Sequence, residues 1–530
     1  MEEYVEKLKL KNFKKFMDNE FLFEPGINVL VGDNDAGKSS VLKAIDIVLN
    51  QSGTDDRRSK LAYGTLMNKD VISDFLKGAQ DVGSLPGMQI EVWLALDDVL
   101  ASSKFDGIQN SENEEKLGVK FSFEFDETYI DEFEYLKEAE EGKLTFVPFE
   151  LYKAKWTTFA GQSYTSRINP LKSIFIDTDK TTGDSFSNYT SQLFAAMNRT
   201  DQHEIGVKLK IALEKVHENI QDNTGRLGID INRIRPIDFL EAFSYNGENL
   251  IPLRDMGSGT ENAIKTELAL NTEAKLILVE EPENHLSFTL ARRQIENLRK
   301  AEDEQRQVIV TTHSPLIVNR MSLSTVRWLK QNRKLQSFSG LNADLINYFE
   351  RMDNVDLLQV LLSSKLIIVE GPTEYILMEN MIKSVTSDSA ENQGIHIMSM
   401  QGDHYKRFVE LAKEIDNKVL IVTDNDSNLE KIEATTYDGG NVKVVLPENV
   451  DEFTFEISLY EQNKAFIEGN ESFRSSTKQE WHSHKSLPLK LVFMLNNKVD
   501  SAIGPTTKYI ESGELQVPKY ILEGIQWLVE

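Results

Sequence analysis

The most specific chemical pattern in the sequence is Gly32-Asp33-Asn34-Asp35-Ala36-Gly37-Lys38-Ser39, which fits G-x-x-x-x-G-K-S. It follows the apolar segment 27–31 and precedes a helix-like segment at 40–45, which is the context that this pattern requires. Backbone N–H groups of such a loop wrap phosphates, and the helix N-terminus favours their negative charge. Lys38 would reach the β- and γ-phosphates, and Ser39 would ligate Mg²⁺. We therefore predict an ATP site rather than a structural glycine turn, with these contact residues: Gly32, Asn34, Gly37, Lys38, Ser39 and Ser40.

Two further strand ends supply groups that a nucleotide site needs. The apolar segment 275–279 ends in Glu280 and Glu281. In the usual division of labour Glu280 holds Mg²⁺ through water, whereas Glu281 orients or deprotonates the attacking water. The apolar segment 308–310 ends in Thr-Thr-His, which places His313 where it could sense the γ-phosphate. The alternatives are acids on a solvated strand end and a histidine satisfied within the core.

A Gly-Ser-Gly sequence at 257–259 opens a predicted helix just before the acidic strand. The order of P-loop, Gly-Ser-Gly helix, Glu-Glu strand and histidine strand resembles the ABC-type ATPases of the SMC and RecF group. In that group the Ser-Gly segment of one protomer caps the ATP of the other, so the resemblance implies that Ser258 and Gly259 act in a head-to-head homodimer. The segment departs from the common Leu-Ser-Gly-Gly-Gln form. Too few residues separate the P-loop from the acidic strand for the long coiled coil of SMC proteins, so that branch is excluded.

A second group of acids follows two other apolar segments. Segment 365–369 ends in Glu370, with Glu374 one helical turn later, and segment 418–423 ends in Asp424-Asn425-Asp426. Parallel strands that end together would place these carboxylates at one edge of a sheet. Such like charges repel one another unless cations neutralise them, and two Mg²⁺ or Mn²⁺ ions could also clamp and hydrolyse a phosphodiester. Ligands that are all oxygen argue against zinc, and the alternative is a pair of solvated strand ends.

Glu-Gly followed by Asp-x-Asp on an alternating strand–helix unit resembles a TOPRIM domain. An ABC-type ATPase followed by TOPRIM is similar to the OLD family of ATP-dependent nucleases, and the resemblance covers nearly the whole chain. It implies a further metal-ligating acid, for which Glu456 is our candidate, and a lysine that stabilises phosphate charge. Lys498 fits that lysine best, with Lys485 and Lys490 as rivals, although Glu456 and Lys498 could each be surface residues. The resemblance further implies bacterial or phage origin and a role in defence against phage, beside a partner protein or a retron-type nucleic acid.

Composition limits the classes of protein that fit the sequence. The 530 residues carry 59 Lys and Arg against 85 Asp and Glu, a net charge of −26, and no cysteine. The lack of cysteine excludes a disulfide scaffold, thiolate zinc sites, iron–sulfur clusters and cysteine nucleophiles. The negative charge argues against a chain coated in nucleic acid, permits a local basic groove and suits carboxylates that bind metal ions. Apolar runs are strand-sized and the N-terminus lacks the apolar stretch of a signal peptide, so we expect a cytoplasmic protein without a membrane span.

The elements that must position these groups are those of an α/β protein. We predict an ABC-type P-loop ATPase domain with a helical insertion that serves dimerisation, followed by a TOPRIM α/β domain. Strands are expected at 5–13, 27–31 and 88–96, an irregular acidic surface insertion at 106–141, helix from 185 to 223, and alternating strands and helices at 237–329 and 365–443. The tail from 458 gives no clear pattern. The predicted boundaries are 1–180 and 231–340 for the two ATPase parts, 181–230 for the insertion, 341–364 for a linker, and 365–530 for the TOPRIM domain with a C-terminal extension.

The predicted function is that of a DNA endonuclease in which the ATPase gates or senses. A topoisomerase would need a strand-passage domain with a tyrosine nucleophile, for which no space remains, and primases or RecR-like TOPRIM proteins usually bring cysteine zinc sites. The other alternative is an ATP-switched DNA-binding or scaffold protein whose TOPRIM domain is inert. His482 and His484 suggest a metal site only superficially, because they lack further ligands nearby in the sequence.

Overall fold

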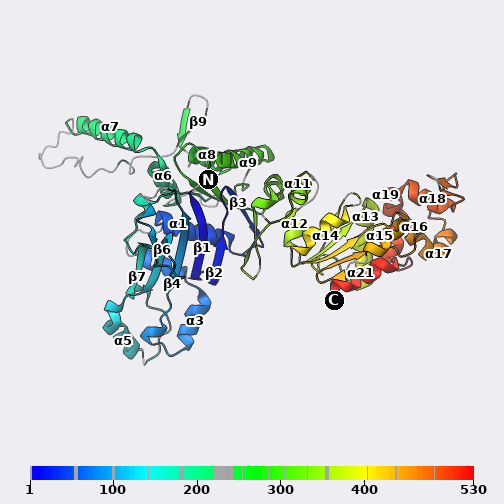
Figure 1. The fold of residues 1–530 in the computed structure, drawn as a ribbon, viewed down its shortest axis with the longest axis horizontal. Coiled ribbons are helices and arrows are strands. Elements are labelled where there is room, and N and C mark those ends of the chain that lie inside the picture. The colour runs from blue at the N-terminus through cyan, green and yellow to red at the C-terminus, as the bar shows by residue number, and fades with distance from the viewer. Residues whose placement is uncertain are drawn as a thin grey trace. The chain divides into compact units, whose positions relative to one another are not determined.

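The computed structural model divides the chain into two compact units, Met1–Leu341 and Asn342–Glu530, which are described separately (Figure 1). The structure describes residues 236, 255, 256 and 402 and the ranges 3–52, 58–97, 102–140, 142–177, 184–218, 243–246, 249–252, 258–284, 286–303, 305–330, 332–338, 340–351, 357–400, 404–435, 438–482 and 484–530. No helix among these residues is long and apolar enough to cross a membrane.

The first sheet of the N-terminal unit is antiparallel and begins with the N-terminal strand of the chain. In β1 (Tyr4–Phe13) the buried side chains Val5, Leu8, Leu10 and Phe13 are interleaved with lysines, which confirms the predicted strand. The strand predicted at 88–96 is confirmed as β4. The strand order is β2 (Phe16–Leu22), β1, β4 (Met88–Ala95), β6 (Lys116–Phe125) and β5 (Asp106–Gly107), and β7 (Tyr152–Thr158) also pairs with β6.

The prediction of an irregular surface insertion at 106–141 is wrong. This segment contains β5, the long strand β6 within the antiparallel sheet, and helix α5 (Ile130–Ala139). Val119, Phe121 and Phe123 alternate along β6 and are fully buried. The acids that gave the segment its polar character lie mostly before and after the strand, so the average composition concealed the alternation.

The second sheet of this unit carries the P-loop. Its order is β14 (Leu335–Ser337), β13 (Val326–Leu329), β3 (Ile27–Gly32), β12 (Gln307–Thr311), β11 (Leu276–Glu280) and β8 (Ile174–Ile176), and only the β13–β14 pair is antiparallel. Thr311 pairs with Leu30 of β3 on one side and with Glu280 of β11 on the other. The carboxyl ends of β3, β12 and β11 therefore meet at one edge.

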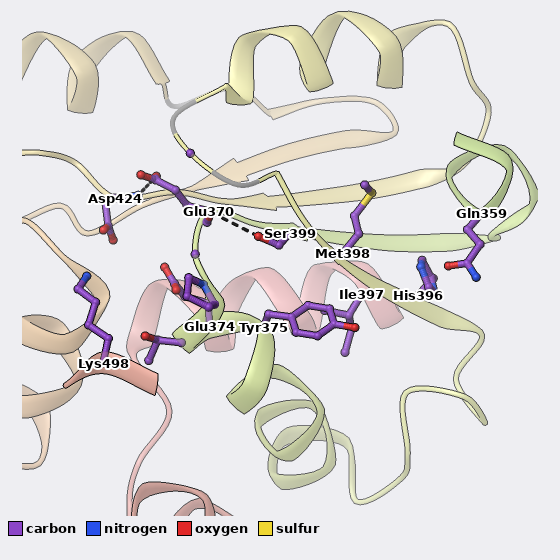
Figure 2. Close-up of a pocket in the computed structure, with 14 residues that line it drawn as sticks. Gln359, Glu370, Glu374, Tyr375, His396, Ile397, Met398, Ser399, Asp424 and Lys498 are labelled. Atoms are coloured by element: carbon purple, nitrogen blue, oxygen red, sulfur yellow. Dashed lines mark hydrogen bonds between the residues drawn. The ribbon is translucent and has the colours of Figure 1, made fainter. Parts of the chain in front are cut away.

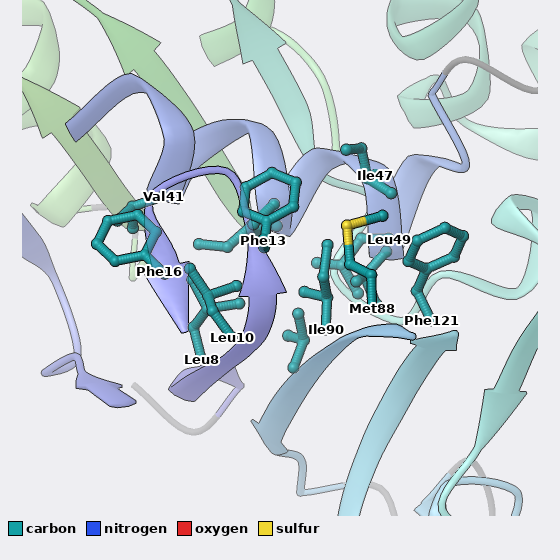
Figure 3. Close-up of a cluster of buried hydrophobic side chains, with 14 of the residues drawn as sticks. Leu8, Leu10, Phe13, Phe16, Val41, Ile47, Leu49, Met88, Ile90 and Phe121 are labelled. Atoms are coloured by element: carbon teal, nitrogen blue, oxygen red, sulfur yellow. The ribbon is translucent and has the colours of Figure 1, made fainter. Parts of the chain in front are cut away.

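Helix α1 (Lys38–Asn50) lies between the two sheets. It packs against β4 and β6 on one side and against β3, β11 and β12 on the other. Figure 3 shows Val41, Ile47 and Leu49 of α1 among side chains of the antiparallel sheet such as Leu8 and Met88. The helix that carries Lys38 and Ser39 is thus held by apolar packing on both faces.

The remaining elements of the N-terminal unit are mostly helical. The helix predicted from 185 is confirmed to residue 218 as α6 (Asp184–Ala196) and α7 (Arg199–Glu218), whereas 219–223 and the start of the alternation predicted at 237 lie outside the described residues. The other elements are α2 (Arg58–Thr65), α3 (Lys69–Lys77), β9 (Phe243–Asn246), β10 (Asn249–Pro252), α8 (Ser258–Leu270), α9 (Phe288–Asp303) and α10 (Pro315–Arg320).

The C-terminal unit is built on a second, mostly parallel sheet. Its order is β16 (Ile395–Ser399), β15 (Lys365–Val369), β17 (Lys418–Val422), β19 (Val442–Val445) and β18 (Asp438–Gly439), and only β18 is antiparallel to its neighbour. Val369 pairs with Val422, so β15 and β17 end side by side. This register confirms the alternation predicted at 365–443 and brings the residues after both strands together.

Helices pack on this sheet, and most of the chain after the sheet is helical. Residues 341–364, for which we predicted a linker, contain α11 (Ala343–Arg351) and α12 (Leu357–Leu362). The C-terminal tail is largely helical, and its last helix packs against α13, β17 and β19. Besides the strands of this sheet, β15 is followed by α13 (Pro372–Thr386), α14 (Tyr405–Lys413), α15 (Leu429–Thr435), α16 (Phe455–Gln462), α17 (Lys464–Gly469), β20 (Glu480–Trp481), β21 (His484–Lys485), α18 (Leu489–Asn496), α19 (Lys498–Ser501), α20 (Thr507–Glu511) and α21 (Lys519–Val529).

Candidate functional site

The phosphate loop leaves β3 at Gly32 and enters α1 at Lys38. Gly37 has a φ of 111°, and a Cβ there would lie 2.5 Å from the ring of Phe16. A Cβ on Gly32 would lie 2.5 Å from the carbonyl oxygen of Leu329. Both positions therefore require glycine, which is the physical reason for the G-x-x-x-x-G spacing. Of the other predicted contacts, Asn34 is exposed in the loop, Ser39 is half-buried and Ser40 is buried in the first turn of α1.

The side chain of Lys38 folds back onto the phosphate loop. Its Nζ donates hydrogen bonds to the carbonyl oxygens of Gly32 at 2.9 Å and Asp33 at 3.1 Å. Burial lowers the pKa of Lys38 to about 8, although the nearby acids Glu281, Asp33 and Glu283 oppose this shift. Phosphate oxygens would therefore supply the negative charge that the buried amine lacks.

The acidic strand and the histidine strand place their groups at the same edge. Glu280 is the buried last residue of β11, and Glu281 follows with a φ of 41°. The Nε2 of His313 lies 3.6 Å from Oε1 of Glu281, and Asn284 donates to Oε2 of Glu281 at 2.9 Å. Burial and the neighbouring Lys38 lower the pKa of His313, which keeps its imidazole neutral at pH 7.

Glu283 is a residue of this site that sequence reasoning missed. Its Oε1 accepts hydrogen bonds from Oγ1 of Thr312 at 2.6 Å and from the backbone N–H of His313 at 2.9 Å. Burial raises the pKa of Glu283. Through these two hydrogen bonds the carboxylate of Glu283 connects the loop after β11 to the loop after β12. The signal in the sequence is the third acid of Glu-Glu-Pro-Glu, but the usual division of labour at such a site requires only two acids.

The predicted Gly-Ser-Gly segment lies at the start of α8. Ser258 and Gly259 are the first two residues of that helix. Gly257 and the side chain of Ser258 lie outside what the structure describes.

In the C-terminal unit, Glu370 and Asp424 meet after β15 and β17 (Figure 2). Oε2 of Glu370 accepts hydrogen bonds from Oγ1 of Thr423 at 2.5 Å and from the backbone N–H of Asp424 at 2.9 Å. Oδ1 of Asp424 in turn accepts from the backbone N–H of Phe455 at 2.9 Å. These bonds link the two strand ends to the start of α16.

Three more residues join this cluster from helices. Glu374 in the first turn of α13 is 5% exposed, and Glu456 in the first turn of α16 is 2% exposed. Glu456 accepts hydrogen bonds from Oγ1 of Thr373 and from Nζ of Lys498, both at 2.9 Å. Of the three candidate lysines, Lys498 is the one that reaches the acids. Lys490 donates instead to the backbone carbonyls of 467, 468 and 470, and Lys485 is exposed on β21.

The electrostatics of the cluster show an excess of negative charge. Burial, followed by the charge of Glu456, raises the pKa of Glu374 to about 7. Burial and the charges of Glu374, Glu370 and Glu456 raise the pKa of Asp424. Burial alone would lower the pKa of Lys498, but Glu456, Asp424 and Glu374 outweigh it and raise this pKa. One lysine therefore does not balance four carboxyl groups, and the cluster favours further cations.

The donor set fits a hard divalent ion, because every ligating atom is a carboxylate oxygen. Within the described part of the chain, however, no group of three or more acid or histidine side chains is already arranged around a common metal position. Glu370 is bound to Thr423 and Asp424, and Glu456 is bound to Lys498. These two carboxylates would have to turn in order to share an ion.

The structure places Asp426 apart from the other acids. Its side chain is 52% exposed, and its Oδ2 accepts from Nζ of the buried Lys431 at 2.8 Å. Its backbone N–H donates to the carbonyl of Phe453, and its φ of 53° turns the chain away from the strand direction. Asp424 and Asp426, which we predict as metal ligands from their i, i+2 spacing, therefore do not lie on one side of an extended segment.

A cavity of about 830 Å³ opens beside the acid cluster within the C-terminal unit. Glu370, Glu374, Asp424 and Lys498 line one part of it. Neither His482, which follows β20, nor His484 of β21 lines this cavity, and His484 stacks on Phe453 with ring centroids 4.6 Å apart.

Comparison with protein families assigns both units. Residues 27–319 match the family model described as "AAA domain, putative AbiEii toxin, Type IV TA system". Residues 361–426 match the model described as "Overcoming lysogenization defect protein-like, TOPRIM domain". The fold is the predicted α/β arrangement of a P-loop ATPase followed by TOPRIM, and the OLD-like resemblance is confirmed.

Two curated relatives are endonucleases by name. The chain is 20% identical over 531 positions to Endonuclease GajA of Bacillus cereus strain HuB5-5, covering 80% of this chain and 76% of that protein. It is 25% identical over 255 positions to Endonuclease GajA of strain VD045, covering 45% of this chain and 43% of that protein.

The solved structures with detectable likeness include SMC heads. The Smc head bound to the C-terminal winged-helix domain of ScpA matches with a TM-score of 0.34 and 14% identity, over 63% of this chain and 99% of that one. The SMC head domain from Thermotoga maritima matches with a TM-score of 0.27 and 11% identity, over 61% of this chain and 94% of that one. TM-scores below 0.5 do not establish a common fold. Because the ATPase model covers more than half of the chain, the protein belongs to the AAA-domain family that this model describes, with an OLD-like TOPRIM domain after its ATPase domain.

Proposed function

We propose that the protein is a divalent-metal-dependent DNA endonuclease whose ATPase domain controls cleavage. The observation that carries this proposal is that Glu370, Glu374, Asp424 and Glu456 form one acidic cluster beside an open cavity, with Lys498 bound to Glu456. The endonuclease name of two relatives supports the same reaction class, and DNA as the substrate rests on the family resemblance.

The four buried or half-buried carboxylates are suited to hold Mg²⁺ or Mn²⁺, and Lys498 to meet the phosphate. Bound ions would activate a water molecule and stabilise the leaving oxygen of a phosphodiester. Lys498 keeps its charge because its pKa is raised, so it can neutralise a non-bridging phosphate oxygen. Phe455 and Thr423 fix the orientation of Asp424 and Glu370 through the hydrogen bonds given above. Asp426 would join the ligands only after leaving Lys431.

In the ATPase unit, Lys38 and the loop around it would bind the β- and γ-phosphates. Ser39 and Glu280 would hold the associated Mg²⁺, and Glu281 would orient the attacking water. The 3.6 Å separation of His313 from Glu281 supports a role for His313 in sensing the γ-phosphate. We further propose a homodimer in which Ser258 and Gly259 of one protomer cap the nucleotide of the other, and a cytoplasmic protein of phage defence; both rest on the family resemblance.

A plasmid nicking assay in Mg²⁺ or Mn²⁺, with and without ATP, tests this function. Wild type should cut, and Glu370→Ala should not cut in either metal. Lys38→Ala should cut at a rate that no longer depends on ATP. The wild-type rates with and without ATP then show whether ATP raises or lowers cleavage. Cutting that survives in both Glu370→Ala and Asp424→Ala would refute the proposed nuclease site.

The second candidate is an ATP-switched DNA-binding scaffold with an inert TOPRIM domain. The Lys431–Asp426 ion pair favours it, because one expected metal ligand is occupied. DNA binding without any cleavage, equal in wild type and Asp424→Ala, would support the scaffold.

A further inference from the structure

The cavity beside the acids extends well beyond the groups that the proposed hydrolysis uses. Figure 2 shows Asp424, Glu370, Glu374 and Lys498 gathered at one end and Gln359 and His396 at the other. The volume of about 830 Å³ lies within the range of natural small-molecule pockets, which is about 300–1,000 Å³. A phosphate and its ions would fill only the acidic end.

The far part of the cavity differs in chemistry from the acidic end. It is lined by Tyr375 and Gln359 and by four consecutive residues of β16, His396 to Ser399. None of these side chains is an acid, a lysine or an arginine. They offer apolar surface together with amide, imidazole, phenol and hydroxyl groups that can both donate and accept hydrogen bonds.

Tyr375 links the two parts of the cavity. It is the residue after Glu374 in α13, so its ring starts one residue away from the acid cluster. Its side chain is 50% exposed although it belongs to a helix that packs on the core. In Figure 2 the ring points away from Lys498 and toward Ile397. A large exposed ring beside a cavity is an unused stacking surface.

We propose that this far part of the cavity is a base-binding pocket, which takes one unpaired nucleobase of the DNA strand next to the phosphate held by the acids. Tyr375 stacks on the base, and Gln359 and His396 face its polar edge. The inference rests on the proposed nuclease function, and it names the substrate class as DNA with an unpaired base at the cleavage point.

The chemistry of the lining favours this occupant over a paired duplex. Within a duplex both faces of a base are covered by its neighbours, so an aromatic side chain can stack only on a base that has left the helix. Lining residues without formal charge suit a nucleobase and not a second phosphate, which would require lysine or arginine. Single-stranded DNA or a duplex with a bulged or mismatched base meets both conditions.

Fluorescence of 2-aminopurine tests the pocket separately from cleavage. The probe is a single-stranded oligonucleotide with 2-aminopurine scanned through successive positions, bound to the full chain with Ca²⁺ in place of Mg²⁺. Stacking on Tyr375 should quench the fluorescence at one position. Tyr375→Ala should lose that quenching and weaken binding at least about fivefold, which is the lower end of base–aromatic stacking. Tyr375→Phe should keep both.

Tyr135→Ala is the matched control, because Tyr135 is 73% exposed in the N-terminal unit. Its quenching and affinity should equal those of wild type. Quenching and affinity that are unchanged in Tyr375→Ala would overturn the pocket, even if Glu370→Ala abolishes plasmid nicking. The opposite result, Tyr375-dependent quenching with no nicking by any protein, would uphold the pocket and refute the nuclease proposal alone.

Discussion

Replacing Glu374 by glutamine should stabilise the metal-free protein above neutral pH. The pKa of Glu374 is about 7 against an ordinary value of 4.5, because burial and then the charge of Glu456 oppose its ionisation. In the unfolded chain the same carboxyl ionises at its ordinary pKa. Between about pH 4.5 and 7 the folded protein therefore holds a proton that the unfolded chain has released.

This difference fixes both the sign and the size of the effect. Folding is favoured by the extra proton, so the free energy of unfolding falls as the pH rises from about 4.5 to about 7 and stays low above that. Since one pKa unit corresponds to about 1.36 kcal/mol, the loss is about 3 kcal/mol. Glutamine has a similar shape and no charge to bury. Glu374→Gln should therefore unfold like wild type near pH 4.5 and be more stable by up to about 3 kcal/mol at pH 8.

Urea unfolding of the metal-free proteins at pH 5 and pH 8 measures the difference in free energy of unfolding between Glu374→Gln and wild type. Hydrogen exchange of peptides from α13 is the readout. Mn²⁺ should then reverse the order, because the ion neutralises the carboxylates of wild type and finds one ligand fewer in the variant. Glu391→Gln is the control, since Glu391 is exposed in the same unit. Equal stabilities of Glu374→Gln and wild type at pH 8 would refute the electrostatic account of the cluster.

Three other substitutions test single contacts. Gly37→Ala should lose about 1–3 kcal/mol of stability and most ATP affinity in a filter-binding assay, because the new Cβ would meet Phe16; Gly142→Ala, which has a φ of 85° but open space, isolates the strain of the backbone. Lys431→Met should tighten Mn²⁺ binding several-fold in a spin-resonance titration by freeing Asp426, and unchanged binding would remove Asp426 from the ligands. Tyr520→Phe should keep or raise the melting temperature, because the buried hydroxyl has no partner among the described residues; a fall equivalent to about 1 kcal/mol or more would show that it has one.

The sequence predicted the parts of both sites that depend on local chemistry. A loop that needs glycine at fixed positions, such as Gly32 and Gly37, leaves a pattern that can be read directly. Glu370 and Asp424 could be placed together because parallel strands that pair in register end at one edge.

Contacts between distant segments could not be predicted from spacing. Glu456 and Lys498 were placed through the family resemblance, and their 2.9 Å ion pair depends on how α16 and α19 pack. Asp426 was expected beside Asp424, but positive φ angles at Asp426 and Ser427 end the extended conformation that the i, i+2 spacing assumed. The ion pair between Asp426 and Lys431 could not be predicted from the sequence, because a single lysine in a helical segment gives the same pattern whether it is paired or solvent-exposed.

The burial of α1 on both faces restricts how the ATPase unit can transmit a signal. Val41, Leu42, Ala44, Ile45 and Val48 are fully buried, so this helix has no free side along which to slide. A close-packed helix of this kind is a rigid support that stays in place. Any movement coupled to nucleotide binding would then have to pass through the segments at the carboxyl edge, where a hydrogen bond from the backbone N–H of His313 to Glu283 joins the loop after β12 to the loop after β11. A change at a bound γ-phosphate would therefore pass from one loop to the next, and not along the helix that begins at Lys38.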